Sequence, residues 1–355
     1  MVEYRLANET DYININDFHN RLFSSNRTIE QFYWEFQNCP HGKSIYIIAE
    51  DGNKVVGTNC VIPIELIDAN NNIILTGKSE DTLVDPAYRG QNIFYNIYQK
   101  LFEECEKSGI RSIWGFTSAA KPFGKLGFDI PYDHKQSLAV NKVTSSYKYL
   151  SGLNVKNRFI DRIKIFGLCT FSKLKMMQLT KTSIIKKYRI SRENVLDGVL
   201  ELIKENLKAD EGSFAINQSS DFQNWRIYQN PNYSRVHTFG FYDDKNILQG
   251  LIVLNSHPNK IAYICHSTFH NNLAKKDVIA MIKYATKEIF GEGIALIRNW
   301  NFTHNSYKKK ETEAYIKARY VFLNRGIGFV WKELGDFKLD PKGFQLSRIA
   351  SQGVK

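Results

Sequence analysis

The chain has 355 residues, a length that suits two ordinary domains better than one. Hydrophobic residues make up 43% and aromatic residues 13%, enough for two buried cores, and no apolar run is long enough to span a bilayer. The five cysteines are odd in number and widely scattered, which excludes a disulfide framework and a zinc knuckle. With no secretory signal at its start, the chain is expected in a reducing cytoplasm.

Helices and strands alternate over the first part of the chain. Thr28 and Gln31 have the spacing of a capping box, and Asp51-Gly52-Asn53 is typical of a hairpin turn. The elements expected here are a strand at 4–6, a helix at 8–23, a helix from 29 that ends before Pro40, strands at 44–50 and 54–64, and a continuing strand at 65–74 with an Asn-rich turn at 70–72.

The stretch 78–128 carries the most specific pattern. A strand that ends at Val84 is followed by the tight loop Arg89-Gly90-Gln91-Asn92 and by a helix from Ile93, in which apolar residues recur every fourth position. The first N–H groups of a helix lack partners and lie at the positive end of its dipole. We therefore expect an anion site with Arg89 beside it, and a pyrophosphate is its natural occupant.

This stretch resembles the GNAT superfamily, the acetyl-CoA-dependent N-acetyltransferases. Residues 84–90 and the helix after them are similar to motif A of that family, Arg/Gln-x-x-Gly-x-Gly/Ala, and residues 119–128, which end in Leu-Gly-Phe, are similar to motif B. The resemblance covers roughly the first 145 residues. It implies an α/β fold with a mixed, mostly antiparallel central sheet and flanking helices, and acetyl-CoA as co-substrate.

Three positions depart from the family pattern. Asn92 stands at the first glycine of motif A, where its tolerance of left-handed backbone can preserve the loop. Phe94 stands at the position where motif A has its second glycine or an alanine. Gly124 stands where many members have a tyrosine that protonates the departing thiolate, so the general acid is unassigned, with Tyr132 and His134 as alternatives to unassisted departure.

The resemblance also implies site residues. The strand 80–84 should present main-chain groups to the thioester, and its carboxylates Glu80 and Asp81 are the catalytic candidates. Strand alternation puts these two on opposite faces, and we choose Glu80 as the base, with binding of acceptor hydroxyls or of Lys78 as the alternative. The residues expected to bind the cofactor are Leu83, Val84, Arg89, Gly90, Gln91, Asn92, Ile93, Phe94 and Ser118.

A second copy of the pattern follows. Trp34 and Pro40 are six residues apart, as are Trp225 and Pro231, and in both copies a strand, an acidic turn and a second strand come next. We infer a tandem of two GNAT-like domains. The expected segments are a GNAT domain with the acetyl-CoA site at 1–145, a basic connecting segment at 146–195, a degenerate GNAT-like domain at 196–340 and a tail at 341–355.

The second copy has no counterpart of Arg89-Gly90, because His270-Asn271-Asn272 stands between its strand and its helix. It is therefore expected to bind no coenzyme A. The echo of motif B at 323–329 is taken to close this copy. His257, His266 and His270 lack a carboxylate cluster, so no metal site is expected.

The segment 151–192 holds most of the net charge. It has eleven Lys and Arg against one acid, Asp161, and thus accounts for +10 of the chain's +12. It is also rich in large apolar residues. A pair of connecting helices that pack on the core, with their lysines facing solvent, would explain this composition. The alternative is an arm that lies on the surface of a membrane containing anionic lipid. No motif supports a nucleic-acid partner.

Two functions of different classes remain from the sequence. The first is an N-acyltransferase, expected to be an N-acetyltransferase, that acts on a small amine, for example an amino sugar of surface-polysaccharide biosynthesis. The second is a non-catalytic acyl-CoA-binding or scaffold protein, which the missing tyrosine and the altered glycines favour. The sequence names neither the acceptor nor the oligomeric state.

Overall fold

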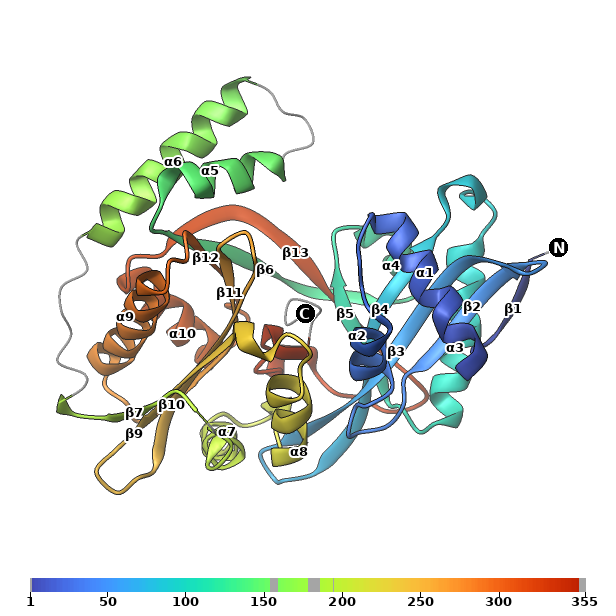
Figure 1. The fold of residues 1–355 in the computed structure, drawn as a ribbon. Coiled ribbons are helices and arrows are strands. Elements are labelled where there is room, and N and C mark those ends of the chain that lie inside the picture. Colours follow the sequence, from blue (N-terminus) through green and yellow to red (C-terminus); the bar gives the residue numbers. More distant parts are fainter. Residues whose placement is uncertain (1, 154–158, 178–185, 194, 351–355) are drawn as a thin grey trace.

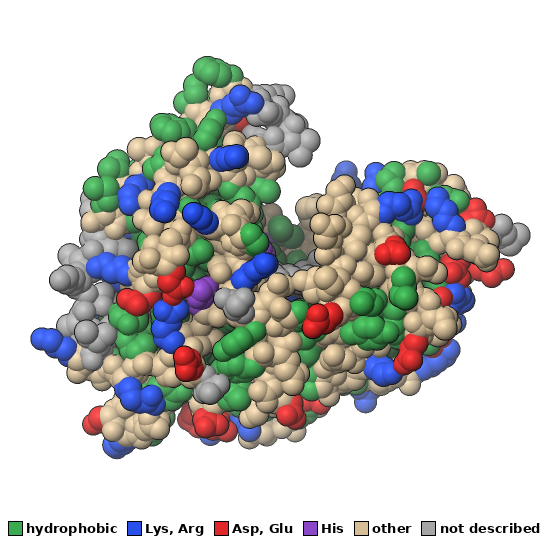
Figure 2. Space-filling model, in the orientation of Figure 1, with side chains coloured by type: hydrophobic (Ala, Val, Ile, Leu, Met, Phe, Trp, Pro, Cys, Tyr) green, Lys and Arg blue, Asp and Glu red, His purple; other side chains and the backbone are tan. Residues whose placement is uncertain are grey.

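A computed structural model of the chain describes residues 2–153, 159–177, 186–193 and 195–350. The described strands form one mixed sheet that runs through both halves of the molecule, with the C-terminal end of the described chain near its centre (Figure 1). The space-filling view shows a hollow between the two halves (Figure 2). The strand order is β1-β2-β3-β4-β5-β13-β6-β12-β11-β10-β9-β7, with β8 paired to β3.

The strands span Glu3–Leu6 (β1), Ile45–Asp51 (β2), Lys54–Asp68 (β3), Ile73–Val84 (β4), Ser112–Thr117 (β5), Asp129–Val140 (β6), Arg189–Ser191 (β7), Phe214–Ile216 (β8), Val236–Tyr242 (β9), Leu248–Ser256 (β10), Ile261–Phe269 (β11), Leu296–Asn301 (β12) and Val321–Glu333 (β13). The α-helices span Tyr12–Phe23 (α1), Ile29–Phe36 (α2), Ile93–Lys107 (α3), Ala120–Lys125 (α4), Val143–Gly152 (α5), Phe159–Met177 (α6), Val199–Lys208 (α7), Ser220–Gln223 (α8), Lys275–Gly291 (α9) and Ser306–Lys317 (α10).

The local predictions for the first part of the chain are largely confirmed. Thr28 and Gln31 form the expected capping box at the start of α2. The Asn-rich turn expected at 70–72 separates β3 from β4, and β3 continues without a break from residue 54 to residue 68. One prediction is wrong, because residues 323–329 lie within β13 and do not close a helix.

The two halves exchange their last strands. β13, from the C-terminal half, pairs antiparallel with β5, and β6, from the N-terminal half, pairs antiparallel with β12. The two exchanged strands also pair with each other. The division predicted at residue 145 falls in the first turn of α5, the helix that follows β6, and it stays a prediction.

The internal repeat is visible as a reciprocal contact. Trp34 Nε1 donates to the carbonyl oxygen of Trp225, and Trp225 Nε1 donates to the carbonyl oxygen of Trp34, both at 2.6 Å. The two indole rings lie 6.2 Å apart and are buried. Such a symmetric pair is what two copies related by a pseudo-twofold axis produce.

Four apolar layers hold the sheet, one of which joins α5 and α6 to β6, β11, β12 and β13. α3 packs on one face of the N-terminal half, and α9 and α10 pack on one face of the C-terminal half. The remaining layer joins α1, α2, α7, α8 and the segment 344–350 in a single core shared by both halves. This shared core and the strand exchange make the two halves one structural unit.

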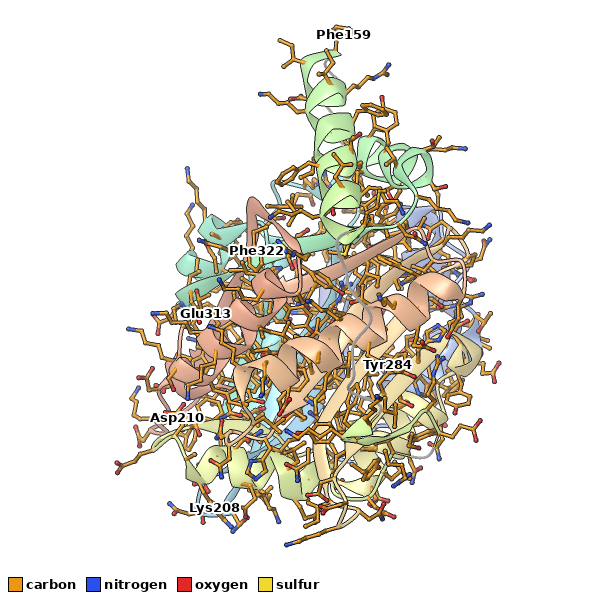
Figure 3. All side chains as sticks on the ribbon, turned by 90° about the vertical axis from the view of Figure 1, so that its left-hand side faces the viewer. Phe159, Lys208, Asp210, Tyr284, Glu313 and Phe322 are labelled. Atoms are coloured by element: carbon orange, nitrogen blue, oxygen red, sulfur yellow. The ribbon has the colours of Figure 1, made fainter. Side chains whose placement is uncertain are left out.

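The described part of the middle segment contains most of α5, all of α6 and the short strand β7. α6 projects from the body with Phe159 at its tip (Figure 3). Residues 154–158 and 178–185, also within the predicted basic segment, lie outside the described residues, as do 351–355 of the predicted tail. Among the described helices none is both long enough and apolar enough to cross a bilayer.

Candidate acyl-transfer site

A cavity of about 340 Å³ opens where two parallel strands separate. β4 and β5 pair only through Gly77 with Ile113 and Lys78 with Trp114. Beyond Lys78 the edge of β4 faces the cavity, so its backbone N–H and C=O groups on that side are available to a ligand. The residues that line the cavity are Phe23, Ser79, Glu80, Asp81, Thr82, Leu83, Val84, Phe94, Gly115, Phe116, Thr117, Ala119, Phe123 and Val330.

A β-bulge shapes the cavity wall. The register of β3 and β4 shifts between Thr58 and Cys60, and opposite this shift Asp81 has a left-handed φ of +48°. The Thr58 hydroxyl donates to the Asp81 carbonyl oxygen at 2.8 Å and fixes the bulge. A bulge inserts an extra residue into one strand and breaks the alternation of side chains.

The two carboxylates therefore lie on the same side of β4, and the alternation assumed from the sequence does not hold here. Thr82 points away from them, with its hydroxyl 3.3 Å from the Tyr98 hydroxyl under α3. Burial raises the pKa of the Cys60 thiol well above its usual range, and the nearby charges of Asp81 and Glu80 raise it further.

Asp81 is held by three side chains. Its carboxylate accepts hydrogen bonds from Arg27 at 2.6 Å and from the Tyr46 hydroxyl at 2.8 Å, and His19 Nδ1 lies at 3.2 Å. Only 1% of its side chain is exposed. Burial disfavours the charge on Arg27, but Asp81 outweighs this effect, so the pKa of Arg27 is raised. These contacts give Asp81 a positioning role at the bulge.

Glu80 is more accessible than Asp81. It forms an ion pair with Lys78, and 13% of its side chain is exposed. Lys78 itself is buried and also donates to the Ser79 carbonyl oxygen at 3.2 Å. Of the two carboxylates, Glu80 is the one that a ligand in the cavity can reach.

The predicted anion loop has the expected backbone. Gly90 has a φ of +86° and nothing within 4 Å of where a Cβ would lie, and Asn92 has a left-handed φ of +59°. Asn92 makes no side-chain cap, so the first N–H groups of α3 have no capping side chain. Arg89 and Gln91 are exposed in this loop.

Not all expected cofactor residues face the cavity. Leu83, Val84 and Phe94 line it, whereas the Ile93 side chain is buried in the core under α3 and could contribute only its main chain. Ser118 is exposed and does not line the cavity, although its neighbours Thr117 and Ala119 do.

The sequence missed several cavity residues. Phe23, Phe116, Phe123 and Val330 contribute apolar surface, and Val330 comes from β13 of the other half. No local pattern indicates this position of β13, because strand order depends on pairing between distant segments. Phe116 and Phe123 lie within the stretch 78–128, in or near the segment that resembles motif B. Their position in the sequence could therefore have indicated that they line the cavity.

The alternative general acids are not in the cavity. Tyr132 is half-buried, with its ring stacked 3.7 Å from that of His304. His134 is buried, and burial lowers its pKa to about 4. The described residues that line the cavity include no tyrosine, histidine or cysteine. Gly124 has open space around it and supplies no proton donor.

The C-terminal half has an equivalent cleft that the chain itself fills. β11 and β12 pair in parallel only over residues 261–263 and 296–298. Beyond that pairing the Arg348 guanidinium stacks on Tyr263 at 4.0 Å and on Trp300 at 4.6 Å. The cavity left there is about 10 Å³, too small for a substrate.

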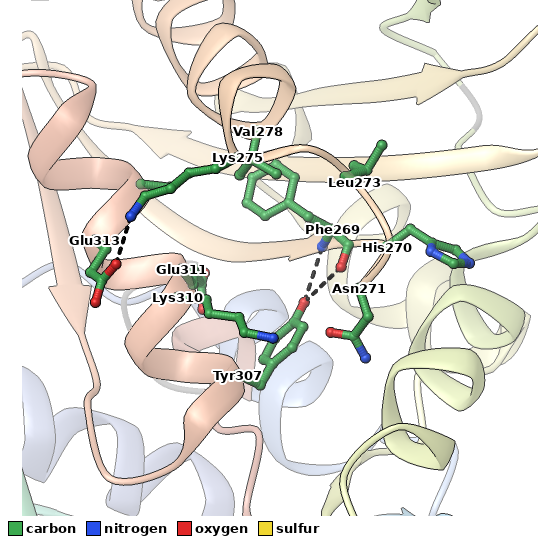
Figure 4. Close-up of a pocket in the computed structure, with 11 residues that line it drawn as sticks. Phe269, His270, Asn271, Leu273, Lys275, Val278, Tyr307, Lys310, Glu311 and Glu313 are labelled. Atoms are coloured by element: carbon green, nitrogen blue, oxygen red, sulfur yellow. Dashed lines mark hydrogen bonds and ion pairs between the residues drawn. The ribbon is translucent and has the colours of Figure 1, made fainter.

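The start of α9, which corresponds to α3, also differs. Its first turn contains Asp277, which is paired with Lys187, so a carboxylate already occupies the positive end of this helix. Between α9 and α10 lies a cavity of about 290 Å³ with a largely apolar wall, bounded by the ion pair of Lys275 with Glu313 at 2.7 Å (Figure 4). In the part of the chain that the structure describes, no three His, Cys, Asp or Glu side chains gather to hold a metal ion.

Comparison with known proteins agrees with this arrangement. Residues 3–130 match the family described as acetyltransferase (GNAT) domain. A search of curated proteins found no match. Three solved structures are similar in fold. A probable N-acyltransferase of unknown function from Enterococcus faecalis is 9% identical, with a TM-score of 0.62 over 94% of this chain and 73% of that one.

The second is the Saccharomyces cerevisiae N-myristoyltransferase with bound myristoyl-CoA and inhibitors, 13% identical, with a TM-score of 0.63 over 94% of this chain and 80% of that one. The third is a tandem GNAT protein from the clavulanic acid biosynthesis pathway, 12% identical, with a TM-score of 0.57 over 95% of this chain and 100% of that one. Residues 3–130 thus match the acetyltransferase (GNAT) domain family, and the described chain has a fold similar to that of a tandem GNAT protein.

Proposed function

We propose that this protein is an acyl-CoA-dependent N-acyltransferase that transfers the acetyl group of acetyl-CoA to the amine of a small acceptor. One observation carries the proposal: the cavity between β4 and β5 is lined by Val84, at the end of β4, and by Phe94, in the uncapped first turn of α3, and the exposed loop Arg89–Asn92, which does not itself line the cavity, lies between these two residues in the chain. A pyrophosphate on that loop would leave the pantetheine arm to follow the free edge of β4.

In the proposed reaction the amine nitrogen attacks the thioester carbonyl carbon, the carbon–sulfur bond breaks and an amide forms. Glu80 takes the proton that the amine loses, directly or through a water molecule. The main chain of β4 at Leu83 and Val84 polarises the carbonyl through the N–H group that points to the free edge, and the cavity holds the two reactants together. The thiolate leaves without a protein acid and takes its proton from water, because Gly124 provides none.

The acceptor approaches from the side of β4 that carries Glu80 and Asp81, toward α1. An amine with hydroxyl groups, such as an amino sugar of surface-polysaccharide biosynthesis, suits a cavity whose polar groups include Glu80, Ser79 and Thr117. We also propose that the reaction takes place in the cytoplasm, because the five cysteines are buried and form no disulfide with one another, which suits a reducing compartment.

A second candidate, a non-catalytic acyl-CoA-binding protein, is favoured by the absence of a proton donor at Gly124. Release of free thiol from acetyl-CoA in the presence of amino sugars and simple amines separates the two. We expect release that depends on the amine and falls about 100-fold or more in Glu80→Gln, the usual scale for a general base. Glu103→Gln, which changes an exposed carboxylate on α3, is the matched control. Acetyl-CoA binding without thiol release for any amine would favour the second candidate.

A further inference from the structure

The outward face of α6 is apolar along its whole length. Seven large side chains on it are each at least half exposed, from 50% for Phe171 to 77% for Phe159. These seven form what we call the apolar stripe: Phe159, Ile160, Ile163, Phe166, Phe171, Leu174 and Met177. Monomeric soluble proteins rarely leave a continuous apolar surface of this kind uncovered.

The helix is attached to the body by its opposite face. Cys169, Ser172 and Met176 are its buried residues, and the Val140 N–H donates to the Ser172 hydroxyl at 3.2 Å. None of the residues from 159 to 168 is buried, so the first half of α6 stands away from the body (Figure 3). The apolar stripe is thus not a by-product of core packing.

Cations flank the apolar stripe on both sides. At about 100° per residue, Arg162 and Lys173 lie along one edge of it and Lys164 and Lys175 along the other, whereas Asp161, the one acid of α6, lies on the opposite face. Lys175 extends over the Phe171 ring at 5.0 Å, so its charge stays close to the stripe. Lys and Arg side chains appear beside exposed apolar side chains on the projecting arm in Figure 2.

We propose that α6 is an interfacial helix that lies on a membrane surface rich in anionic lipid. The apolar stripe enters the boundary between headgroups and acyl chains, and the two rows of cations reach the lipid phosphates. A second copy of the chain is a poorer occupant, because pairing two stripes would bring cation rows together with no facing acid. The proposal is independent of the chemistry in the β4–β5 cavity.

Co-sedimentation of the full chain with phosphatidylcholine–phosphatidylglycerol vesicles tests the proposal. We expect retention at low salt that weakens at about 0.15 M salt, where exposed charges are screened. Ile163→Ser/Phe166→Ser should lower the partition coefficient at least tenfold. Lys164→Gln/Lys175→Gln should lower it about 30-fold, which corresponds to about 1 kcal/mol for each cation.

Two controls match these variants. Ile247→Ser removes an apolar side chain that is 54% exposed, remote from α6, and Lys309→Gln/Lys317→Gln removes two exposed cations of α10. Neither should change retention. The proposal is overturned by equal retention on pure phosphatidylcholine, by no retention at low salt, or by stripe variants that bind as the native chain does. A lipid-free dimer in sedimentation velocity that Ile163→Ser/Phe166→Ser dissociates would overturn it in favour of self-association.

Discussion

Gly90→Val tests whether the loop Arg89–Asn92 binds the pyrophosphate, and Gly109→Val at the other end of α3 is the matched control. Gly90 and Gly109 lie at the two ends of α3, with φ of +86° and +74°, and neither has an atom within 4 Å of its missing Cβ. Valine at either position meets no clash and is penalised only through its backbone, by about 1–2 kcal/mol or somewhat more for a β-branched residue. The two variants should therefore lose similar free energy of unfolding.

Their effects on ligand binding should differ. At Gly90 the new side chain would lie beside the first N–H groups of α3 and keep a pyrophosphate from approaching them, whereas Gly109 lies at the other end of the helix. Loss of one charge-assisted hydrogen bond is worth about 1.5–3 kcal/mol, so acetyl-CoA should bind about 10–100-fold more weakly to Gly90→Val. Calorimetric titration measures this change, and chemical denaturation measures stability. Equal affinities for Gly90→Val and Gly109→Val would refute the assignment of this loop.

Two further predictions concern stability. Burial lowers the pKa of His134 to about 4 and that of His266 to about 3, below the value of about 6.5 in the unfolded chain. Because the folded protein holds both histidines neutral, the free energy of unfolding is unaffected by them above pH 6.5 and decreases as pH falls toward 4. Each histidine should lower the free energy of unfolding by up to about 1.4 kcal/mol per pH unit in that window. Equal denaturation midpoints at pH 7 and pH 5 would contradict this prediction. Trp34→Phe and Trp225→Phe each remove one of the reciprocal hydrogen bonds and should lower the free energy of unfolding by about 1–3 kcal/mol in a single transition; separate melting of the two halves would argue against one unit.

The parts of the fold that could be predicted are those with local causes. The Thr28 capping box depends on residues three apart, and the left-handed backbone at Asn92 depends on one side chain in one loop. The repeat was visible because Trp34 and Trp225 keep the same distance to a proline, although nothing in the sequence indicated that they contact each other.

The parts that could not be predicted depend on distant segments. β13 lies between β5 and β6, and thereby carries Val330 into the cavity, only because the two halves exchange strands. The bulge at Asp81 changed which side chains share a face, and its cause, the shifted pairing with β3, has no local sign. Arg348 fills the second cleft from the far end of the chain, so the sequence could indicate that the second copy binds no coenzyme A but could not indicate this filling of the cleft.

The central claim is that one acyl-CoA binds per chain, in the N-terminal half. Titration of acetyl-CoA to saturation in a calorimeter tests it most directly, with Arg89→Ala beside the native chain and Arg111→Ala, which changes an exposed arginine after α3, as the control. We predict one site per chain, weakened by about 1–3 kcal/mol in Arg89→Ala and unchanged in Arg111→Ala. Two equivalent sites per chain, or native affinity in Arg89→Ala, would contradict the claim.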